Sequence, residues 1–368
     1  MTQPSSNSET LQENRVLPFP ALTGQEHVKQ ALLMLAVNPR LSGLLIRGEK
    51  GTAKSTAARG LARLLPPIKI NQGCRFGCVA GPSRSWCSEC RERPKPATVE
   101  KRPPFETLPL GITEDQLLGT FDLEQALKHG EKRFAPGLLA RVNQGVLYVD
   151  ELNLLDDHII DVLLDSTASG INYVEREGIS IVHPAVFLLV GTMNPEEGEL
   201  RPQFQDRFGL CAEIRTLPDP EKRIEIIERS LEFEANPRAF RAKWAKQEKV
   251  LTATIARARR ILPKIEPHRD WHRVAVELSV SLEVHGHRAD ILMIKAAATL
   301  AALDGRMEIA PHDIETAATL VYPHRLRRMP FEEAQLSEPE LRERAREAIH
   351  SFVDSVSKKK SLPSKDRP

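Results

Sequence analysis

The sequence lacks any apolar run close to the roughly twenty residues that a membrane-spanning helix needs, so no such helix is predicted. It has few aromatic residues (5%) and little net charge, +2 from 52 basic and 50 acidic side chains, which argues against a nucleic-acid-binding surface. The first thirteen residues are polar and resemble neither a secretory signal nor a transit peptide, so a cytoplasmic protein is expected. Because 368 residues exceed one comfortable core, we expect two domains.

The most informative stretch is a short apolar strand at residues 44–46 that runs into a glycine-containing loop ending in Lys54 and Ser55. Such a loop wraps its N–H groups around phosphates, its lysine reaches the terminal phosphates, and its hydroxyl binds Mg²⁺. Ala53 stands where the pattern has glycine, so the backbone there must adopt a conformation open to alanine. The predicted ligands are ATP and Mg²⁺, and the predicted binding residues are Gln25, Gly48, Glu49, Lys50, Gly51, Thr52, Ala53, Lys54, Ser55 and Thr56.

A second apolar run, residues 145–149, ends in Asp150 and Glu151. A central parallel strand delivers acid groups beside bound phosphates in this way, so Asp150 is predicted to hold Mg²⁺ through water and Glu151 to polarise the attacking water. The alternative is a buried strand with two polar residues at its exposed end. The phosphate loop upstream favours the catalytic interpretation.

Three polar residues further along the chain are candidates for sensing the nucleotide. Asn194 follows the apolar run 186–193, where AAA+ ATPases place a residue that senses the γ-phosphate. Arg207 fits an arginine finger, because its planar, permanently charged fork spreads positive charge over phosphoryl oxygens. Arg288, at a predicted helix start, is a candidate second sensor. The alternative for each arginine is an ordinary surface position or salt bridge.

Strand, loop and helix alternate up to Asp219, where a capped helix begins and strand patterns end. The fold class is therefore α/β, a P-loop parallel sheet sandwiched by helices, with a C-terminal all-α lid. Apolar positions such as Ile224, Ile227 and Leu231 predict amphipathic helices of a small bundle. The expected divisions are a disordered N-terminus (1–16), a nucleotide-binding domain (17–218) with a cysteine-rich insertion (71–95), a helical lid (219–348) and a disordered basic tail (349–368).

Four of the five cysteines fall in two close pairs, Cys74 with Cys78 and Cys87 with Cys90. Two tight turns that each present two sulfurs suit a tetrahedral site, so structural Zn²⁺ is predicted. An iron–sulfur cluster uses the same ligands, and free thiols are the remaining alternative. Disulfides are disfavoured in a cytosolic chain. Cys211 stands apart and is expected in the core.

Taken together, these motifs resemble the I-type AAA+ ATPase subunit of magnesium chelatase and the similar subunits of cobaltochelatases, over about residues 19–324. The most specific stretches are residues 108–120, 135–140, 147–157, 174–181 and 194–203. The resemblance implies a homo-oligomeric ring, a hexamer, with ATP sites between subunits. It also implies that Arg207 acts on the neighbour's nucleotide, and it leaves open whether Arg288 serves its own site or the adjacent one.

The function implied by the resemblance is ATP hydrolysis coupled to insertion of Mg²⁺ into protoporphyrin IX, a step of chlorophyll and porphyrin biosynthesis. The implied partners are a D-type subunit with a von Willebrand-like domain and a large subunit that binds the porphyrin, without nucleic acid or membrane. A cobaltochelatase of the cobalamin pathway is an alternative, towards which the four-cysteine cluster points, because the photosynthetic subunits lack it. A MoxR-like chaperone ATPase is a second alternative, and a DNA translocase is disfavoured by the near-neutral charge.

Overall fold

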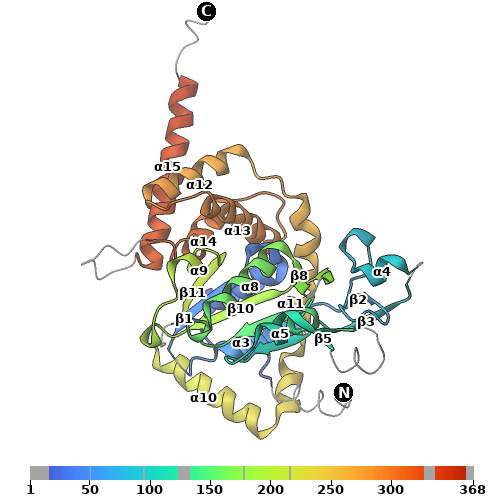
Figure 1. Ribbon diagram of the computed structural model, residues 1–368. Coiled ribbons are helices and arrows are strands. Elements are labelled where there is room, and N and C mark those ends of the chain that lie inside the picture. The colour runs from blue at the N-terminus through green and yellow to red at the C-terminus, as the bar shows by residue number, and fades with distance from the viewer. Residues whose placement is uncertain are drawn as a thin grey trace, which may run out of the picture.

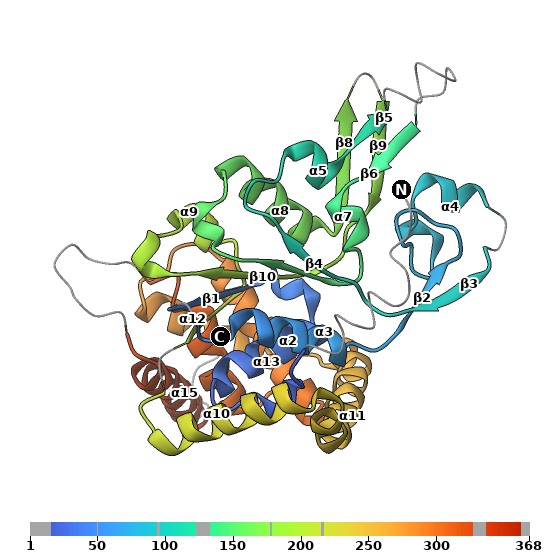
Figure 2. The same ribbon diagram turned by 90° about the horizontal axis from the view of Figure 1, so that it is seen from below.

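The computed structural model describes residues 16–49, 51–93, 96–122, 133–176, 179–214, 217–326 and 336–361. At its centre lies a five-stranded sheet in the order β11-β1-β10-β7-β4, in which every neighbouring pair of strands is parallel. Its strands are β1 (Leu44–Gly48), β4 (Phe105–Leu108), β7 (Val146–Val149), β10 (Leu188–Met193) and β11 (Leu210–Ile214). Central strands that are apolar throughout need cover on both faces. Helices lie on both sides of the sheet, as the sequence predicted (Figures 1 and 2).

The alternation of side chains along the strands divides the interior into two cores. Leu44 and Ile46 of β1 belong to a core that includes α2 (Glu26–Val37), α3 (Lys54–Leu64) and the C-terminal helices. Leu45, on the opposite face, belongs to a second core with α8 (Asp157–Ser169). The molecule therefore has three layers, with the sheet in the middle (Figure 2).

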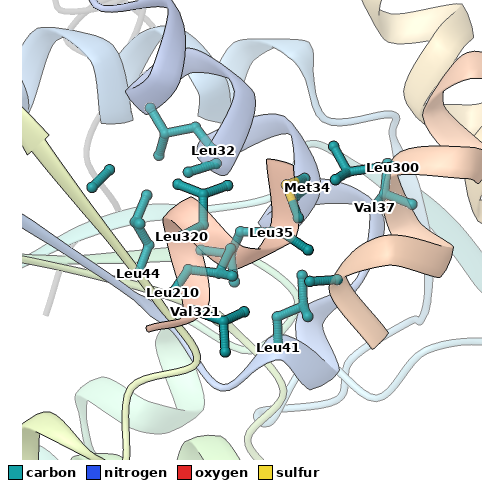
Figure 3. Packing of buried hydrophobic residues seen from close by; sticks show 14 of the residues in the cluster. Leu32, Met34, Leu35, Val37, Leu41, Leu44, Leu210, Leu300, Leu320 and Val321 are labelled. Atoms are coloured by element: carbon teal, nitrogen blue, oxygen red, sulfur yellow. The ribbon is translucent and has the colours of Figure 1, made fainter. Parts of the chain in front are cut away.

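The first core joins the sheet directly to the C-terminal helices. Figure 3 shows Leu32 and Leu35 of α2 beside Leu44 of β1, Leu210 of β11 and Leu320 of α14 (Pro311–Val321). All five side chains are fully buried. Burial of each leucine contributes about 1.5–3 kcal/mol, so this contact fixes the helical region on the edge of the sheet next to β11.

Three small two-stranded sheets decorate the central one. They are β2 (Ile68–Asn71) with β3 (Thr98–Lys101), β5 (Gly119–Asp122) with β6 (Arg133–Pro136), and β8 (Ile171–Arg176) with β9 (Ile179–Pro184). The cysteine-rich segment, with the short helix α4 (Ser88–Glu92), connects β2 to β3. The β5–β6 and β8–β9 hairpins project together from one face of the sheet (Figure 2). The short helices of this half are α5 (Glu114–Leu118), α7 (Leu138–Arg141), α9 (Pro202–Gln205), η1 (Phe19–Ala21), η2 (Pro39–Leu41), η3 (Ser83–Ser85), η4 (Leu152–Leu154) and η5 (Pro195–Glu197).

From Pro220 onward the described residues contain only helices: α10 (Pro220–Ala235), α11 (Pro237–Ile261), η6 (Leu262–Lys264), α12 (Arg269–Ser281), α13 (Arg288–Asp304), α14 and α15 (Glu338–Ser361). The expectation that Ile224, Ile227 and Leu231 face a bundle is wrong. These side chains are 46%, 58% and 60% exposed, and α10 has no buried residue. A helical period shows that one face is apolar but does not show what covers it.

The expected tail is also corrected in part. Helix α15 continues to Ser361, so residues 349–361 are helical rather than disordered, and Ile349 and Phe352 at the start of this stretch pack on the first core. Residues 1–15 and 362–368 lie outside the described residues. Among the helices that the structure describes, none is both long and apolar enough to cross a membrane.

Candidate nucleotide site

The phosphate loop joins β1 to α3 at the carboxyl edge of the sheet. Gly48 and Gly51 have φ values of +155° and +79°, which glycine tolerates best. The ammonium of Lys54 is largely buried and donates hydrogen bonds to the carbonyls of Gly48 (2.5 Å) and Glu49 (3.0 Å). A buried ammonium that donates to neutral carbonyls can exchange these contacts for phosphate oxygens. Lys50, also predicted here, lies outside the described residues.

Ala53 does not adopt a backbone conformation that favours alanine, contrary to the expectation from the sequence. Its φ of +60° and ψ of +25° place it in the left-handed region just before α3. Alanine can occupy this region only at a cost of about 1–2 kcal/mol. The loop therefore keeps the backbone of the glycine pattern while carrying a Cβ that this backbone disfavours. The side-chain amide of Gln25 braces the same turn by donating to the carbonyl of Thr52 at 2.7 Å.

The acidic pair follows β7 directly, with Asp150 exposed at the strand end. Its Oδ1 accepts hydrogen bonds from the hydroxyls of Thr192 (2.7 Å) and Tyr148 (3.0 Å). The Thr192 hydroxyl in turn accepts a bond from the Glu151 backbone N–H at 3.2 Å. Glu151 has a φ of +52°. Thr192 thus joins the Asp150 carboxylate to the Glu151 backbone, and Tyr148 orients Asp150. The sequence reading missed both Thr192 and Tyr148.

Burial raises the pKa of the Tyr148 phenol, and the nearby Asp150 charge raises it further. The phenol therefore stays protonated near neutral pH and donates to the carboxylate. A tyrosine two residues before an aspartate on a strand points to the same face, and this spacing is a signal that sequence reasoning can use.

Asn194 follows β10, which lies between β1 and β7 in the sheet. Its side chain is buried and its Oδ1 accepts a hydrogen bond from the Glu196 N–H at 3.3 Å. Because parallel strands end at the same edge, the phosphate loop, the acidic pair and Asn194 come together there.

The two candidate arginines lie together, and no described hydrogen bond joins either of them to residues 48–56. The guanidinium of Arg207 bonds to Asp161 at 2.5 Å and also to Asp165, both on α8. Arg288, at the start of α13, donates to the backbone carbonyl of Arg207 at 2.7 Å. Burial lowers the pKa of Arg288. The negative charge of Asp206 partly opposes this shift, and the positive charge of Arg207 adds to it.

The segment that carries Arg207 is held by two neighbours that the sequence reading missed. Arg325 is buried and bonds to Asp206 Oδ1 at 3.2 Å and to the carbonyl of Phe208. His324 shares the Phe208 carbonyl at 3.0 Å. Burial lowers the pKa of Arg325 to about 10. No motif marks these residues, because their partners lie more than a hundred positions earlier in the chain.

The four clustered cysteines converge, and none of them forms a disulfide. The Sγ atoms of Cys74, Cys78, Cys87 and Cys90 all lie within 4.8 Å of one another, and three of the four residues are buried. The Sγ atoms of Cys74 and Cys87 are 3.9 Å apart. Hydrogen bonds from Cys78 and Cys87 lower the pKa of Cys74. Cys211 lies in the core as expected, where burial raises its pKa to about 11.

The cysteine-rich segment is anchored to the body of the molecule. The ring of Phe76 stacks on His183 of β9 with centroids 4.6 Å apart. The side-chain amide of Asn143 donates to the carbonyls of Phe76 (2.9 Å) and Gly77 (3.1 Å). The four thiols therefore sit against the base of the β8–β9 hairpin.

A phosphate loop, an acidic pair and a polar sensor position at the carboxyl edge of a parallel sheet, followed by a helical domain, define a class: this is a P-loop ATPase of AAA+ architecture. Comparison with known families agrees. Residues 19–207 match the family described as magnesium chelatase, subunit ChlI, and residues 272–344 match an AAA lid domain.

Similar proteins lead to the same family. A magnesium-chelatase subunit ChlI homolog of Methanocaldococcus jannaschii is 48% identical over 89% of this chain and 90% of its own. Magnesium-chelatase subunit ChlI of Synechocystis sp. is 47% identical over 86% of this chain and 90% of its own. A cryo-EM-based structure of the complex between subunits BchI and BchD of magnesium chelatase is 42% identical, with a TM-score of 0.51, and the match covers 85% of this chain and 97% of that one. The chain belongs to the magnesium-chelatase ChlI subunit family, which confirms the resemblance drawn from its motifs.

Proposed function

We propose that this chain is the ATP-hydrolysing motor subunit of a magnesium chelatase, which couples ATP hydrolysis to insertion of Mg²⁺ into protoporphyrin IX. The family supports the complex, and the fixed geometry of Asp150 and Glu151 beside the phosphate loop carries the ATPase part. Mg²⁺ gives up its water reluctantly, and the macrocycle must be distorted and lose two protons to encircle it, so the step needs an energy source.

In the proposed ATP site, each residue has one task. Lys54 exchanges its carbonyl partners for phosphate oxygens, and Ser55 and Asp150 hold the Mg²⁺ that accompanies the nucleotide and neutralises phosphate charge. Glu151 orients and polarises the attacking water, and its αL backbone with the Thr192 bond fixes its position. Asn194 contacts the γ-phosphate from β10.

In the proposed ring, Arg207 and Arg288 act on the nucleotide of the neighbouring subunit. Arg288 binds the segment that carries Arg207, and neither has a described bond to its own phosphate loop. Asp161 and Asp165 hold the Arg207 fork until a more concentrated negative charge, the transferring phosphate of a neighbour, competes for it. A ring of copies, a hexamer, supplies that neighbour, and further partners are a D-type subunit and a large porphyrin-binding subunit.

We further propose that the four cysteines hold one Zn²⁺ ion. A tetrahedral site with Zn–S distances of about 2.3 Å has sulfurs ~3.8 Å apart, and the 3.9 Å between Cys74 and Cys87 fits this spacing. The ion would supply structural crosslinking, which a segment with few buried apolar residues needs. An iron–sulfur cluster remains the competing occupant.

The function is tested by reconstitution. The purified chain is combined with D-type and large partner subunits, ATP, and either Mg²⁺ with protoporphyrin IX or Co²⁺ with a cobalamin precursor. We expect insertion of Mg²⁺ that needs ATP and is lost with Glu151→Gln. Insertion of Co²⁺ alone would favour the cobaltochelatase alternative, and ATP hydrolysis without insertion of either metal would favour a chaperone ATPase.

A further inference from the structure

A cavity of about 550 Å³ opens at the amino-terminal edge of the central sheet, opposite the phosphate loop. The strand starts of β7 and β10 form its floor, and α11, η6 and α13 close it from the helical side. Nothing in the proposed ATPase mechanism uses this cavity.

The charges that line the cavity are all of one sign. Arg40, which is exposed, and the half-buried Arg259 and Lys295 contribute cations, and none of the lining residues that the structure describes is acidic. Arg259 is fixed in place because its Nε and Nη2 donate to the carbonyl of Ala36 at 2.9 Å and 2.7 Å. Among the described residues, Arg40 and Lys295 form neither an ion pair nor a side-chain hydrogen bond.

This arrangement is unfavourable without an anion. Partial burial lowers the pKa of Lys295, and the charges of Arg40 and Arg288 lower it further. Burial also lowers the pKa of Arg259. Repulsion from Arg40 and desolvation therefore disfavour the Lys295 ammonium, and desolvation disfavours the Arg259 guanidinium. A bound anion offsets both effects. The cluster therefore favours a negatively charged occupant.

The other lining residues of the cavity favour a ligand with an apolar part as well as a negative charge. Leu65, Phe187, Leu188 and Leu262 present apolar surface beside the cations. The volume lies within the roughly 300–1,000 Å³ range of small-molecule sites, which are mostly apolar with a few polar groups that orient the ligand. Inorganic phosphate would satisfy the cations and leave the apolar wall uncovered.

We propose that this cavity binds a small organic anion, with a carboxylate or phosphate against Lys295, Arg40 and Arg259 and an apolar body against the leucine and phenylalanine wall. The site is separate from the ATP site, since the two lie at opposite ends of the parallel strands. It does not depend on the proposed chelatase function.

The test is calorimetric titration of the full chain with three probes: octanoate, which combines both features, octanol, which lacks the charge, and inorganic phosphate, which lacks the apolar body. We expect one octanoate per chain and at least tenfold weaker binding of the other two. Lys295→Gln should weaken octanoate binding at least tenfold, and Lys295→Arg should keep most of it. Lys249→Gln, at an exposed position of α11 outside the cavity, is the control for lost charge.

The outcomes separate clearly. Octanoate binding that is the same in Lys295→Gln and in the unchanged protein overturns the site, as does absence of octanoate binding. Phosphate binding as tight as octanoate binding overturns the apolar half of the proposal. Octyl phosphate in place of octanoate then shows which anionic group is preferred. Circular dichroism and ATP hydrolysis of each variant confirm that it is folded.

Discussion

Within one chain, the guanidinium of Arg288 donates a hydrogen bond to the backbone carbonyl of Arg207 at 2.7 Å. A residue that served its own nucleotide would be expected to approach its own phosphate loop, and neither arginine forms a described bond there. The contact makes the two arginines one unit, carried by the start of α13 and by the segment before β11.

This relationship predicts complementation between two inactive variants. In a mixed ring of Arg288→Ala and Glu151→Gln subunits, an Arg288→Ala subunit keeps an intact Glu151, and a Glu151→Gln neighbour supplies an intact Arg288. If Arg288 acts across the interface, ATP hydrolysis reappears when the two variants are mixed. With random assembly of equal amounts, one interface in four combines an intact Glu151 with an intact Arg288, so the rate should reach about a quarter of that of the unchanged protein. Steady-state ATPase assays at several mixing ratios measure it.

The matched control is a mixture of Arg207→Ala and Glu151→Gln, which should behave in the same way. Recovery in this control without recovery for Arg288→Ala would place Arg288 at its own subunit's nucleotide. Absence of recovery in the control mixture would remove the across-interface role of Arg207. Mixing Arg207→Ala with unchanged subunits should lower activity in proportion to the share of the variant if the sites act independently, and a steeper loss would show that the sites of one ring are coupled.

Thr192 predicts a second effect, because its hydroxyl donates to Asp150 and accepts from the Glu151 amide. Thr192→Val keeps the shape and removes both bonds. Loss of an outer contact of this kind typically costs 10–100-fold, so kcat for ATP should fall by that amount while nucleotide affinity changes little. Thr192→Ser keeps the hydroxyl and should retain most activity. Equal losses in both variants would point to packing instead.

The sequence predicted the parts of this site that follow from local pattern. Residues 44–55 and 145–151 each combine a strand with the polar residues at its end, so their positions follow once the strands are parallel. Arg325 carries no such signal, because it acts through Asp206 and Phe208, which precede it by more than a hundred residues. Helix α10 shows a second limit of sequence-based prediction. The periodicity of its apolar residues identifies an apolar face, but it does not show whether another part of the chain covers that face.

Ala53 predicts a change in stability rather than in chemistry. The left-handed backbone destabilises the folded protein by about 1–2 kcal/mol when the residue is alanine. Glycine avoids this strain, but it raises the conformational entropy of the unfolded chain, which lowers stability by about 0.4–1 kcal/mol. Ala53→Gly should therefore stabilise the protein by roughly 0.5–1 kcal/mol by that difference, measured by urea unfolding. Ala57→Gly, in the helical interior of α3, should destabilise it by about 1 kcal/mol. A destabilising Ala53→Gly would contradict the left-handed conformation.

The cysteine site predicts a stoichiometry. Elemental analysis of the purified chain should give one zinc per chain, and iron with matching sulfide would support a cluster instead. Cys90→Ser should lower the metal content and loosen the segment around Phe76, so hydrogen exchange of residues 74–90 should rise. Cys211→Ser, in the core but outside the group of four converging thiols, should leave the metal content unchanged. Retention of zinc in Cys90→Ser would exclude the four-thiolate site.

His324 predicts how stability depends on pH. Its ring is buried beside Arg325, and its pKa lies well below the ordinary value of about 6.5 because burial and then the Arg325 charge disfavour the imidazolium. The unfolded chain takes up a proton near pH 6.5 that the folded chain refuses. Stability from this residue is therefore fully present above about pH 6.5 and falls on acidification by up to ~1.4 kcal/mol per pH unit.

His324→Gln keeps a donor for the Phe208 carbonyl but does not titrate, so its stability should fall less between pH 6.5 and pH 5.5 than that of the unchanged protein. Urea unfolding at pH 7.5, 6.5 and 5.5 measures the two slopes. His285→Gln, which replaces an exposed ring in solvent contact, is the control and should keep the original slope. Equal slopes for His324→Gln and the unchanged protein would mean that other groups, such as the buried His183, whose pKa burial also lowers, set the acid limit of folding.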